Sequence, residues 1–481
     1  MTKHLDIDTK AMRAKILDLA IQGKLTDQRE EDGNARDLLK EIQAEKEKLI
    51  KEKKIKKGKP LPEIEADEIP FEIPKNWMWA RWGTLSISIK YGYNTSAQKD
   101  GKIKMVRISD IQNNQVNWDS VPFCNIPKEE ITQYLLRKND ILFARTGGTV
   151  GKSYLVSEVP ENVVYAGYLI RTRYSEKLSP QYLKYFMESD LYWSQLKKGT
   201  TTTAQPNCNA KTLGKMVLPL PPLAEQKRIA DKVATLFAQL DAIDKAYEEY
   251  RELQQAMKAK LLDLAVQGKL TDQRAEDGNA RDLLKEIQAE KEKLIKEKKI
   301  KKEKLLLEIT EEEKTFDIPE NWMWVRLGEM ILNHIGGGTP DKSNEAYWNG
   351  DIPWMSVKDV HQDSMYADRT IDSITPAGLE NSSSNLIEAN RLIVVMRMAV
   401  GRAVINKLPV AINQDLRALF FRDNVTQEYI LRIFKILKFE TSGMTVKGIK
   451  LWVLLNTPIP LPPLAEQKRI VAKLDELLPL L

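Results

Sequence analysis

Cysteine and histidine are scarce in this chain of 481 residues, which contains two cysteines and three histidines. Cys124 and Cys208 are too few to form a disulfide framework in so long a chain, and this scarcity favours a reducing compartment such as the cytoplasm. His4, His334 and His361 lie far from one another in the sequence, and none has the spacing to a cysteine that a zinc site requires. We therefore expect neither disulfides nor a bound metal.

Long apolar runs are also missing. No stretch approaches the run of about 18 apolar residues that a transmembrane helix needs, and the opening residues Met1-Thr-Lys-His-Leu-Asp6 do not resemble a signal peptide. The apolar content of 42% and the charged content of 30% are typical of a soluble protein with exposed charged helices. The net charge of +6 permits binding to nucleic acid without requiring it. We expect a cytoplasmic protein without membrane contact.

Catalytic motifs are absent as well. The segment Gly147-Gly-Thr-Val-Gly-Lys-Ser153 is one residue too short for a phosphate-binding loop, because Thr146 stands where the first glycine is needed. We interpret it as a Gly-rich turn between strands that displays Arg145 and Lys152. No Asn/Asp-Pro-Pro-aromatic motif of an adenine methyltransferase is present, and no Asp/Glu-x-Lys triplet follows Pro340-Asp341 closely enough for a nuclease site. The chain is therefore predicted to be non-catalytic.

A long helix is predicted from Leu223 to Ala265, because apolar residues recur there at alternating steps of four and three and no glycine or proline interrupts them. This period of 3.5 residues is typical of a coiled-coil seam, and the helix would be roughly 65 Å long. A long helix inside a bundle is the alternative. The predicted apolar seam positions in this helix are Ile229, Val233, Leu236, Leu240, Ile243, Tyr247, Tyr250, Met257, Leu261 and Leu264.

The two ends of the chain repeat the two halves of this helix. Residues 460–470 copy residues 219–229, Pro-Leu-Pro-Pro-Leu-Ala-Glu-Gln-Lys-Arg-Ile, and residues 12–57 copy residues 257–302 almost unchanged. The C-terminal copy continues the seam through Ile470, Leu474 and Leu477. We interpret the chain as a circularly permuted two-fold repeat, in which the two ends form a second helical segment that packs antiparallel against the central helix.

The repeated segments are more alike than packing requires. Residues 31–57 match residues 276–302 at every position, although exposed helix positions tolerate many substitutions at little cost. We hypothesise that the identity is maintained at the DNA level, as a recombination site that lets modules be exchanged between gene copies and so changes the sequence that is recognised. A recent duplication is the alternative.

Between the helical segments lie two globular modules with short strand-like runs separated by Gly, Asn and Ser. Both modules begin alike, with Phe71-Glu-Ile-Pro-Lys-Asn-Trp-Met-Trp79 and Phe316-Asp-Ile-Pro-Glu-Asn-Trp-Met-Trp324, and then diverge strongly. The fold class is therefore predicted as modular α/β (α+β), with two α/β domains separated by long antiparallel coiled-coil helices in a pseudo-two-fold arrangement. The predicted boundaries are 1–69 for an N-terminal helical region and linker, 70–218 for the first module, 219–304 for the central helical region, 315–459 for the second module and 460–481 for a C-terminal helix.

The chain resembles the specificity (S) subunit of type I restriction-modification enzymes over essentially its whole length. The resemblance is carried by the repeated Leu-Pro-Pro-Leu-Ala-Glu-Gln-Lys-Arg segments and by Gln22-Gly-Lys-Leu-Thr26 with its copy at 267–271. Inside the modules it is carried by Leu142-Phe-Ala-Arg-Thr-Gly-Gly-Thr-Val-Gly151, Gly338-Thr-Pro340, Tyr347-Trp-Asn-Gly-Asp-Ile-Pro-Trp354 and Asn413-Gln-Asp-Leu-Arg417. The first module has no counterpart of the 347–354 motif.

The resemblance implies two target-recognition domains, each of which reads one half of a bipartite double-stranded DNA site. It implies that two methyltransferase subunits dock on the conserved regions and that restriction subunits can join them. This chain would then bind no cofactor itself. S-adenosylmethionine would belong to the methyltransferase subunits, and ATP and Mg²⁺ to a restriction subunit where one is present.

Basic and amide side chains near Gly-rich turns are the candidates for DNA contact, because Arg and Lys reach phosphates while Arg, Asn and Gln pair with base edges. A supporting role in the fold is the alternative for each, and Asn413-Gln-Asp415 in particular could brace the end of a strand. The candidates are Arg107, Arg145, Lys152, Gln205 and Asn207 in the first module, and Lys358, Arg397, Arg402, Asn413, Gln414 and Lys447 in the second.

Three other functions are weighed against this one. The first is a related methyltransferase-nuclease system without a separate translocating restriction subunit. The second is a complete nuclease-methyltransferase, which the absent motifs oppose. The third is a structural coiled-coil adaptor, which the two diverged modules with their Trp and Arg residues oppose.

Overall fold

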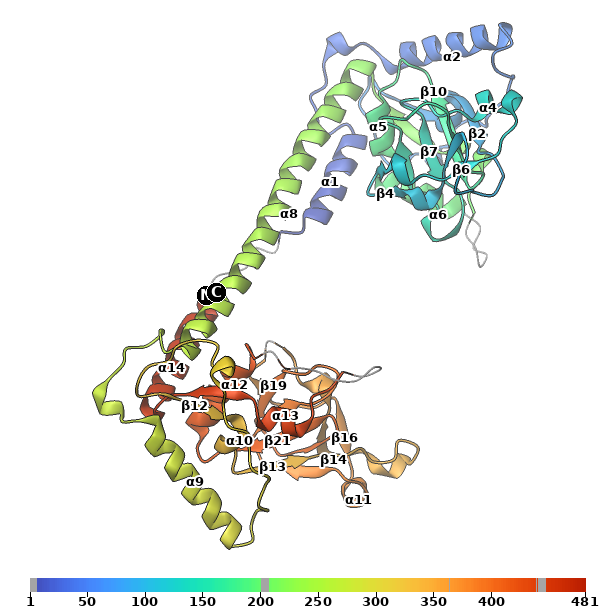
Figure 1. Cartoon of the computed structure of the whole chain (residues 1–481). Coiled ribbons are helices and arrows are strands. Elements are labelled where there is room, and N and C mark those ends of the chain that lie inside the picture. The colour runs from blue at the N-terminus through green and yellow to red at the C-terminus, as the bar shows by residue number, and fades with distance from the viewer. Residues whose placement is uncertain (1–6, 200–206, 363, 438, 440–446) are drawn as a thin grey trace. The chain divides into compact units, whose positions relative to one another are not determined.

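The computed structural model describes residues 7–199, 207–362, 364–437, 439 and 447–481 (Figure 1). The chain forms two compact units that divide within one helix, between Tyr247 and Glu248. The first unit contains the first module and the second unit contains the second module.

The predicted long helix is confirmed as α8, which runs from Leu223 to Val266 without interruption over 44 residues. Its end is fixed by Gly268, whose φ of +69° lies in the left-handed region. A Cβ atom at Gly268 would lie 2.5 Å from a ring carbon of Pro319, so this turn requires glycine for space as well as for conformation.

Two helices precede the first module. The helix α1 spans Thr9–Ile21 and is capped by the Asp8 carboxylate, which accepts a hydrogen bond from the Ala11 amide. The helix α2 spans Ala35–Lys51 and is capped by the side chain of Asn34. The repeated helix α9, Ala280–Lys296 in the second unit, has the same sequence and the equivalent cap, Asn279.

The first module is built from short strands and helices. Its strands are β1 Met78–Arg81, β2 Ser86–Tyr91, β3 Ile103–Val106, β4 Ile111–Gln112, β5 Gln115–Val116, β6 Phe123–Cys124, β7 Ile141–Ala144, β8 Ser153–Leu155, β9 Val163–Tyr165, β10 Leu169–Tyr174 and β11 Val217–Leu220. Its helices are α3 Trp82–Leu85, α4 Lys128–Tyr134, α5 Pro180–Phe186, α6 Asp190–Gly199 and α7 Ala210–Lys215. The sheets have the strand orders β2-β10-β7-β8, β6-β3-β9, β4-β5 and β1-β11.

The second module has a similar plan with more strands. These are β12 Met323–Arg326, β13 Asn333–Gly336, β14 Trp348–Met355, β15 Tyr366–Ala367, β16 Asp372–Ile374, β17 Asn385–Ile387, β18 Leu392–Val395, β19 Ala403–Asn406, β20 Val410–Ile412, β21 Leu416–Phe420 and β22 Pro458–Leu461. The helices are α10 Leu327–Met330, α11 Pro376–Glu380, α12 Asn424–Phe434, α13 Leu451–Leu455 and the C-terminal α14 Leu464–Leu477. The sheets have the orders β13-β21-β18-β19-β15, β16-β14-β20-β17 and β12-β22.

Each module enters and leaves its helical frame through one pair of antiparallel strands. In the first unit β1 pairs with β11, with Met78 opposite Leu220 and Trp79 opposite Pro219. In the second unit β12 pairs with β22 in the same register, with Met323 opposite Leu461. Because the two pairs are equivalent, the same neck holds two modules of different sequence.

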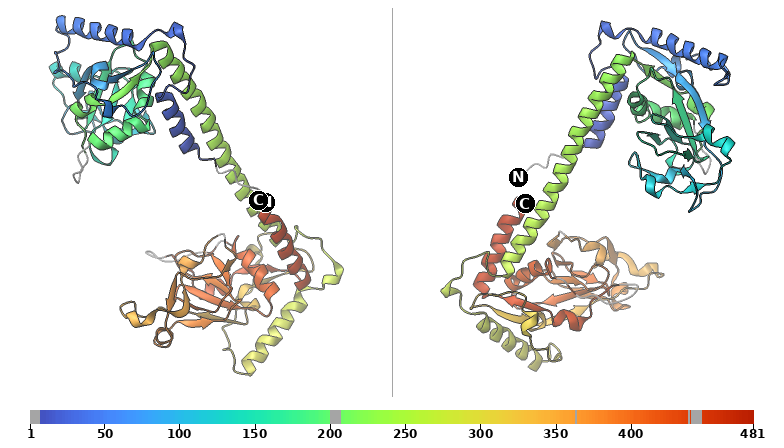
Figure 2. Two further views of the ribbon diagram at one scale, coloured as in Figure 1. Left: turned by 180° about the vertical axis from the view of Figure 1, so that it is seen from behind. Right: turned by 45° about the horizontal axis from the view of Figure 1, so that its top comes forward.

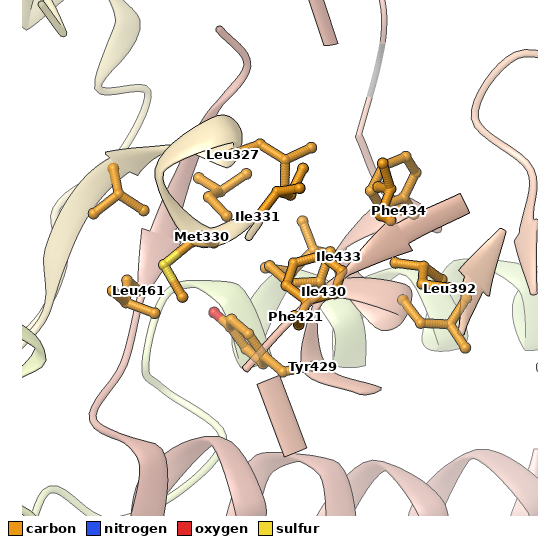
Figure 3. Packing of buried hydrophobic residues seen from close by; sticks show 14 of the residues in the cluster. Leu327, Met330, Ile331, Leu392, Phe421, Tyr429, Ile430, Ile433, Phe434 and Leu461 are labelled. Atoms are coloured by element: carbon orange, nitrogen blue, oxygen red, sulfur yellow. The ribbon is translucent and has the colours of Figure 1, made fainter. Parts of the chain in front are cut away.

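The module and the helices share one hydrophobic core in each unit. In the second unit this core joins Ala265 of α8, Ile287 of α9 and Ile470 of α14 to the strands and helices of the module, and Figure 3 shows its part around Tyr429, Ile430 and Phe434. In the first unit the equivalent core contains Ile229 of α8. The sequence suggested globules with cores of their own, but burying the helices in the same core fixes each module rigidly to its frame.

The helices alongside α8 run antiparallel to it within each unit (Figure 2). In the first unit, Thr9 at the start of α1 donates to Asp244, and Arg13 one turn later pairs with Asp241 at 2.8 Å. In the second unit, the chain after α14 ends with the carbonyl of Leu481 accepting from Gln254, while Glu466 in the first turn of α14 accepts from residues beyond the end of α8.

The predicted seam is buried only in part. Ile229, Val233, Leu240, Ile470 and Leu474 are buried, and Leu236, Tyr247, Leu261, Leu264 and Leu477 are half-buried. The prediction was wrong for Ile243, Tyr250 and Met257, which are 37%, 47% and 46% exposed. These three lie in the middle of α8, where the described parts of α1 and α14 reach their ends, so the neighbouring helix covers them incompletely.

The chain between Pro180 and Gly199 forms two short helices. The helix α5 ends at Phe186 and α6 begins at Asp190. The hydroxyl of Ser189 accepts from the Tyr192 amide and so begins a new helix.

Candidate nucleic-acid interface

The turn between β7 and β8 has the predicted form. A single 3₁₀ turn, Gly147–Thr149, follows Thr146, and Lys152 is exposed where β8 approaches. Gly147 has φ of +75°, and among the described residues a Cβ atom there would meet nothing within 4 Å. The turn lacks the helix start that a phosphate-binding loop would need.

Arg145, which precedes this turn, contacts an aromatic ring. Its guanidinium lies over the ring of Tyr91, 4.6 Å from the ring centre, and such a contact restrains the side chain. Its carbonyl oxygen accepts a hydrogen bond from the Cys208 amide at 2.9 Å, and Asn207 forms a β-bridge with Thr146. The structure thus brings together Arg145 and Asn207, two of the predicted contact residues.

Arg107 has a local partner of its own. Arg107 pairs with Asp110 at 2.7 Å, and the hydrogen bond that its guanidinium donates to that carboxylate raises the pKa of Arg107. Because the pair closes a local 3₁₀ turn, Arg107 has a bracing role, with its side chain still 41% exposed. Gln205 lies outside the residues that the structure describes.

In the second module, Asn413 and Gln414 follow strand β20. Asn413 is buried, and its side-chain oxygen accepts a hydrogen bond from the backbone amide of Asp415 at 3.0 Å. The backbone amide of Asn413 donates to the Met355 carbonyl at 3.0 Å. The bracing alternative therefore describes Asn413 in this structure. Gln414 is exposed, and its side-chain oxygen accepts a hydrogen bond from the Thr339 hydroxyl.

Arg397 and Lys447 lie together beside this turn. Arg397 donates from Nε to the Asp415 carboxylate and is 48% exposed, which leaves the far side of its guanidinium accessible. Lys447 is exposed, and its carbonyl accepts from the Met398 amide at 2.8 Å. Met398 is unusual because its φ is +72° and its side chain is 66% exposed.

The remaining two cations of the second module flank the same region. Lys358 is exposed on the 3₁₀ turn Val357–Asp359, which follows β14. Arg402 is half-buried, and its Nη1 lies 3.5 Å from the carbonyl of Val360. Arg402 is therefore less available to DNA than Lys358 is.

A cavity of about 430 Å³ joins several of these side chains. Its wall combines two tryptophans with amide, carboxylate and ammonium groups. The lining residues are Thr339, Lys342, Trp348, Trp354, Ser356, Val357, Lys358, Asp372, Met398, Asn413, Gln414 and Asp415. Such a mixture of aromatic surface with donors and acceptors suits nucleotide contact. Three predicted contact residues, Lys358, Asn413 and Gln414, meet here.

The sequence prediction missed Trp348, Lys342 and Met398 as members of this site. Trp348 stands in the 347–354 motif, which was noticed only as a mark of resemblance. A tryptophan pair flanking Gly350-Asp-Ile-Pro353 was the available signal. Nothing in the local sequence marks Met398, because its left-handed conformation is set by the turn.

A second set of side chains joins each module to its frame, and it is the same in both units. Glu225 accepts from the Trp77 indole at 2.7 Å and from Gln28 at 2.6 Å, and Glu466 accepts from Trp322 and Gln273 at the same distances. Burial raises the pKa of Glu225, against the lowering effect of these donors.

An ion pair next to this carboxylate is repeated too. Arg228 pairs with the buried Asp32 at 2.5 Å, and its hydrogen bond holds the pKa of Asp32 below the ordinary value. Arg469 pairs with Asp277 in the second unit with the same effect. The repeated sequence thus builds the same joint twice.

Within the described part of the chain, no cluster of three His, Cys, Asp or Glu side chains is arranged to hold a metal ion. No helix among the same residues is long and apolar enough to span a membrane.

The matches with known proteins cover both modules. Residues 89–250 and 319–479 both match the family model for the type I restriction modification DNA specificity domain. The chain is 28% identical to the EcoEI specificity subunit of Escherichia coli, over 97% of this chain and 88% of that protein. It is 27% identical to the EcoAI specificity subunit of the same species, over 98% and 89%. A solved chain of a type I R-M system superposes with a TM-score of 0.54 at 24% identity, over 85% of this chain and 91% of that chain.

Proposed function

The chain belongs to the type I restriction modification DNA specificity family, and from this premise we propose that each of its modules reads one half of a bipartite DNA site. The proposal rests on the observation that equivalent strand pairs, β1-β11 and β12-β22, hold two modules of different sequence. Repeated helical segments that hold two modules of different sequence suit a protein in which each module recognises different bases.

The exposed groups of the second module supply the chemistry for this reading. Lys342, Lys358 and Lys447 are exposed cations that suit phosphates. Arg397 and Gln414 carry the donors that can pair with base edges in the major groove. In the first module, Arg145 on the face of Tyr91 and Lys152 suit the same two roles.

The helical frame would set the distance between the half-sites. In this proposal α8 and the antiparallel helices α1 and α14 form a coiled-coil ruler, and the repeat gives the two readers a pseudo-two-fold relation. The antiparallel contacts of Arg13 with Asp241 and of Gln254 with Leu481 support it.

We further propose that the frame docks two methyltransferase subunits, one on each repeat, and that restriction subunits can join the assembly. The exposed apolar side chains of Ile243, Tyr250 and Met257 on α8 support a docking role, because a partner helix can cover them. S-adenosylmethionine would be bound by the methyltransferase subunits, and ATP and Mg²⁺ by a restriction subunit. This chain would contribute recognition and spacing.

A binding experiment with the assembled complex tests the proposal. The chain and its methyltransferase partner are purified together. The affinity of this complex for a duplex that contains the sequence it methylates is compared with its affinity for random DNA at several salt concentrations. We expect specific binding to be at least about a thousandfold tighter, with both affinities falling as salt rises. Equal affinity for both duplexes would reject the proposal and would favour the adaptor alternative.

A further inference from the structure

We propose that the cavity of the second module receives a nucleobase that has left the stack of the DNA duplex. The inference rests on the proposed function, since it assigns a further role to the same surface. It goes beyond reading base edges in the groove, because the base itself would enter the protein.

The aromatic side of the cavity is rigid. Trp348 is anchored by its indole N–H, which donates to the Asp341 carbonyl at 3.0 Å, and its ring packs edge-on against Trp354 with the centroids 5.1 Å apart. Trp354 is fixed in turn by donating to the Gly338 carbonyl at 3.2 Å. An immobilised tryptophan is a stacking surface for any base, at little entropic cost.

The polar side of the cavity suits a base better than a phosphate. Asp372 contributes a carboxylate, which would repel a phosphate but accept hydrogen bonds from the amino or imino groups of a base. The carboxylate of Asp415 also lines the cavity and is already paired with Arg397. Gln414 adds a side-chain amide beside them. Such mixed donors and acceptors match the Watson–Crick edge of an extruded base. The exposed ammonium groups of Lys342 and Lys358 suit the phosphates on either side of it.

Met398 supplies the element that would replace the base in the stack. It lines the cavity, its side chain is 66% exposed, and its backbone is held at φ +72°. A side chain is unfavourable in this conformation, and the corresponding turn of the first module places Gly147 at its left-handed position. An exposed methionine at a strained position indicates a role for the side chain. Apolar side chains can wedge between base steps and unstack them.

The proposal applies to one half-site only. The first module has no counterpart of the 347–354 segment that carries Trp348 and Trp354. Base extrusion is therefore expected in the half-site that the second module reads.

A mismatch scan tests the proposal on the complete complex of this chain with its methyltransferase partner. Once the target is known, single mismatches are placed at every position of both half-sites, and equilibrium affinities are measured by fluorescence anisotropy. A mismatch removes most of the cost of unpairing a base. We expect binding to tighten, by about fivefold or more, at one position of one half-site, and to weaken at the positions that are read in the groove.

Three variants connect this effect to the cavity. Trp348→Ala should abolish the tightening at that position, and Trp348→Phe should restore it. Met398→Gly relieves backbone strain and so preserves folding. It should weaken binding to the paired duplex while leaving the mismatched duplex tightly bound. Trp452→Ala, at a tryptophan that is 41% exposed outside this cavity, is the control and should behave like the wild type.

The outcomes separate the two proposals. Tightening that depends on Trp348 supports the cavity as a base receptor. Tightening only at the adenine that becomes methylated, unchanged by Trp348→Ala, would assign extrusion to the methyltransferase and overturn the inference. Absence of tightening at every position would overturn it too, while specific binding would still support the proposed function. If the wild-type complex showed no preference for the target over random DNA, this inference and the proposed function would both be rejected.

Discussion

At the scale of single residues, the cavity of the second module places side chains of different chemistry next to one another. Gln414 is an exposed amide with a donor group, and Lys358 is an exposed ammonium. An amide can discriminate between base edges, whereas an ammonium attracts any phosphate. Substitutions at these two positions should therefore affect sequence recognition and general DNA affinity separately.

Gln414→Ala is expected to weaken binding to the target by about 1–3 kcal/mol and to relax the preference at one position of one half-site. Lys358→Ala is the matched control, and it should weaken specific and random DNA alike and reduce the salt dependence. Competition binding with duplexes altered at single positions measures both effects. If Gln414→Ala weakened all duplexes equally, Gln414 would hold only the DNA backbone.

Residue types alone predicted part of the site in the second module. Amides and cations near Gly-rich turns were identified from sequence, and Lys358, Asn413 and Gln414 do line one cavity. The sequence left two roles open for Asn413, and burial with bonds to its own turn favours bracing. Trp348 was missed as a site residue because a tryptophan near a strand is usually part of a core.

At the scale of elements, the central helix α8 has buried and exposed apolar positions in close succession. Leu240 is 4% exposed, while Ile243 is 37% exposed. Both belong to the predicted seam, so the apolar period alone could not distinguish a position covered within the chain from one left uncovered. That distinction depends on where α1 begins and α14 ends.

Leu240→Asp is expected to lower the free energy of unfolding by several kcal/mol, because a charge would be buried among apolar groups. Ile243→Asp, one turn along the same helix, should change stability by less than about 1 kcal/mol but weaken binding of the methyltransferase subunit. Denaturant unfolding and size-exclusion chromatography measure the two effects. A stable Leu240→Asp protein would show that this part of α8 is not packed against a neighbour.

The ion pair between Arg326 and Glu313 is expected to make stability depend on acid pH. Both oxygens of Glu313 accept from the buried Arg326 guanidinium, at 2.7 and 2.8 Å, and the pKa of Glu313 falls from 4.5 to about 2. A lowered pKa in the folded state stabilises the fold above pH 4.5, and this contribution is lost as the pH falls towards 2.

Glu313→Gln should therefore flatten the loss of stability between pH 4.5 and 2, as measured by thermal unfolding across that range. Glu311→Gln, at an 87% exposed carboxylate on the same turn, is the control. An acid limb that is unchanged by Glu313→Gln would show that this ion pair does not contribute to the pH dependence.

The helices were more predictable than the strands. An apolar period without glycine or proline predicted α8 to within a few residues. The strands are short, and the sheet order β13-β21-β18-β19-β15 joins segments far apart in sequence. Such pairing depends on tertiary contacts that no local pattern contains. Ser189, which separates α5 from α6, acts through a cap that an apolar pattern does not reveal.

At the scale of the whole molecule, the repeat makes the two modules interchangeable in principle. The same joint, built around Trp77 and Glu225 in one unit and around Trp322 and Glu466 in the other, holds each module. The proposed asymmetry of the DNA target then arises only from the differences between the modules. An exchange of modules should alter the target and leave the frame intact.

The most direct test replaces the first module, residues 70–218, with a copy of the second, residues 315–459, and sequences the methylated adenines in cells that also carry the methyltransferase partner. Because both readers would then be identical, we predict that methylation moves to a symmetric site composed of two inverted copies of one original half-site. The wild-type chain, measured in parallel, should give an asymmetric bipartite site containing that half-site once. Methylation by the altered chain at the original asymmetric site would contradict the assignment of one half-site to each module.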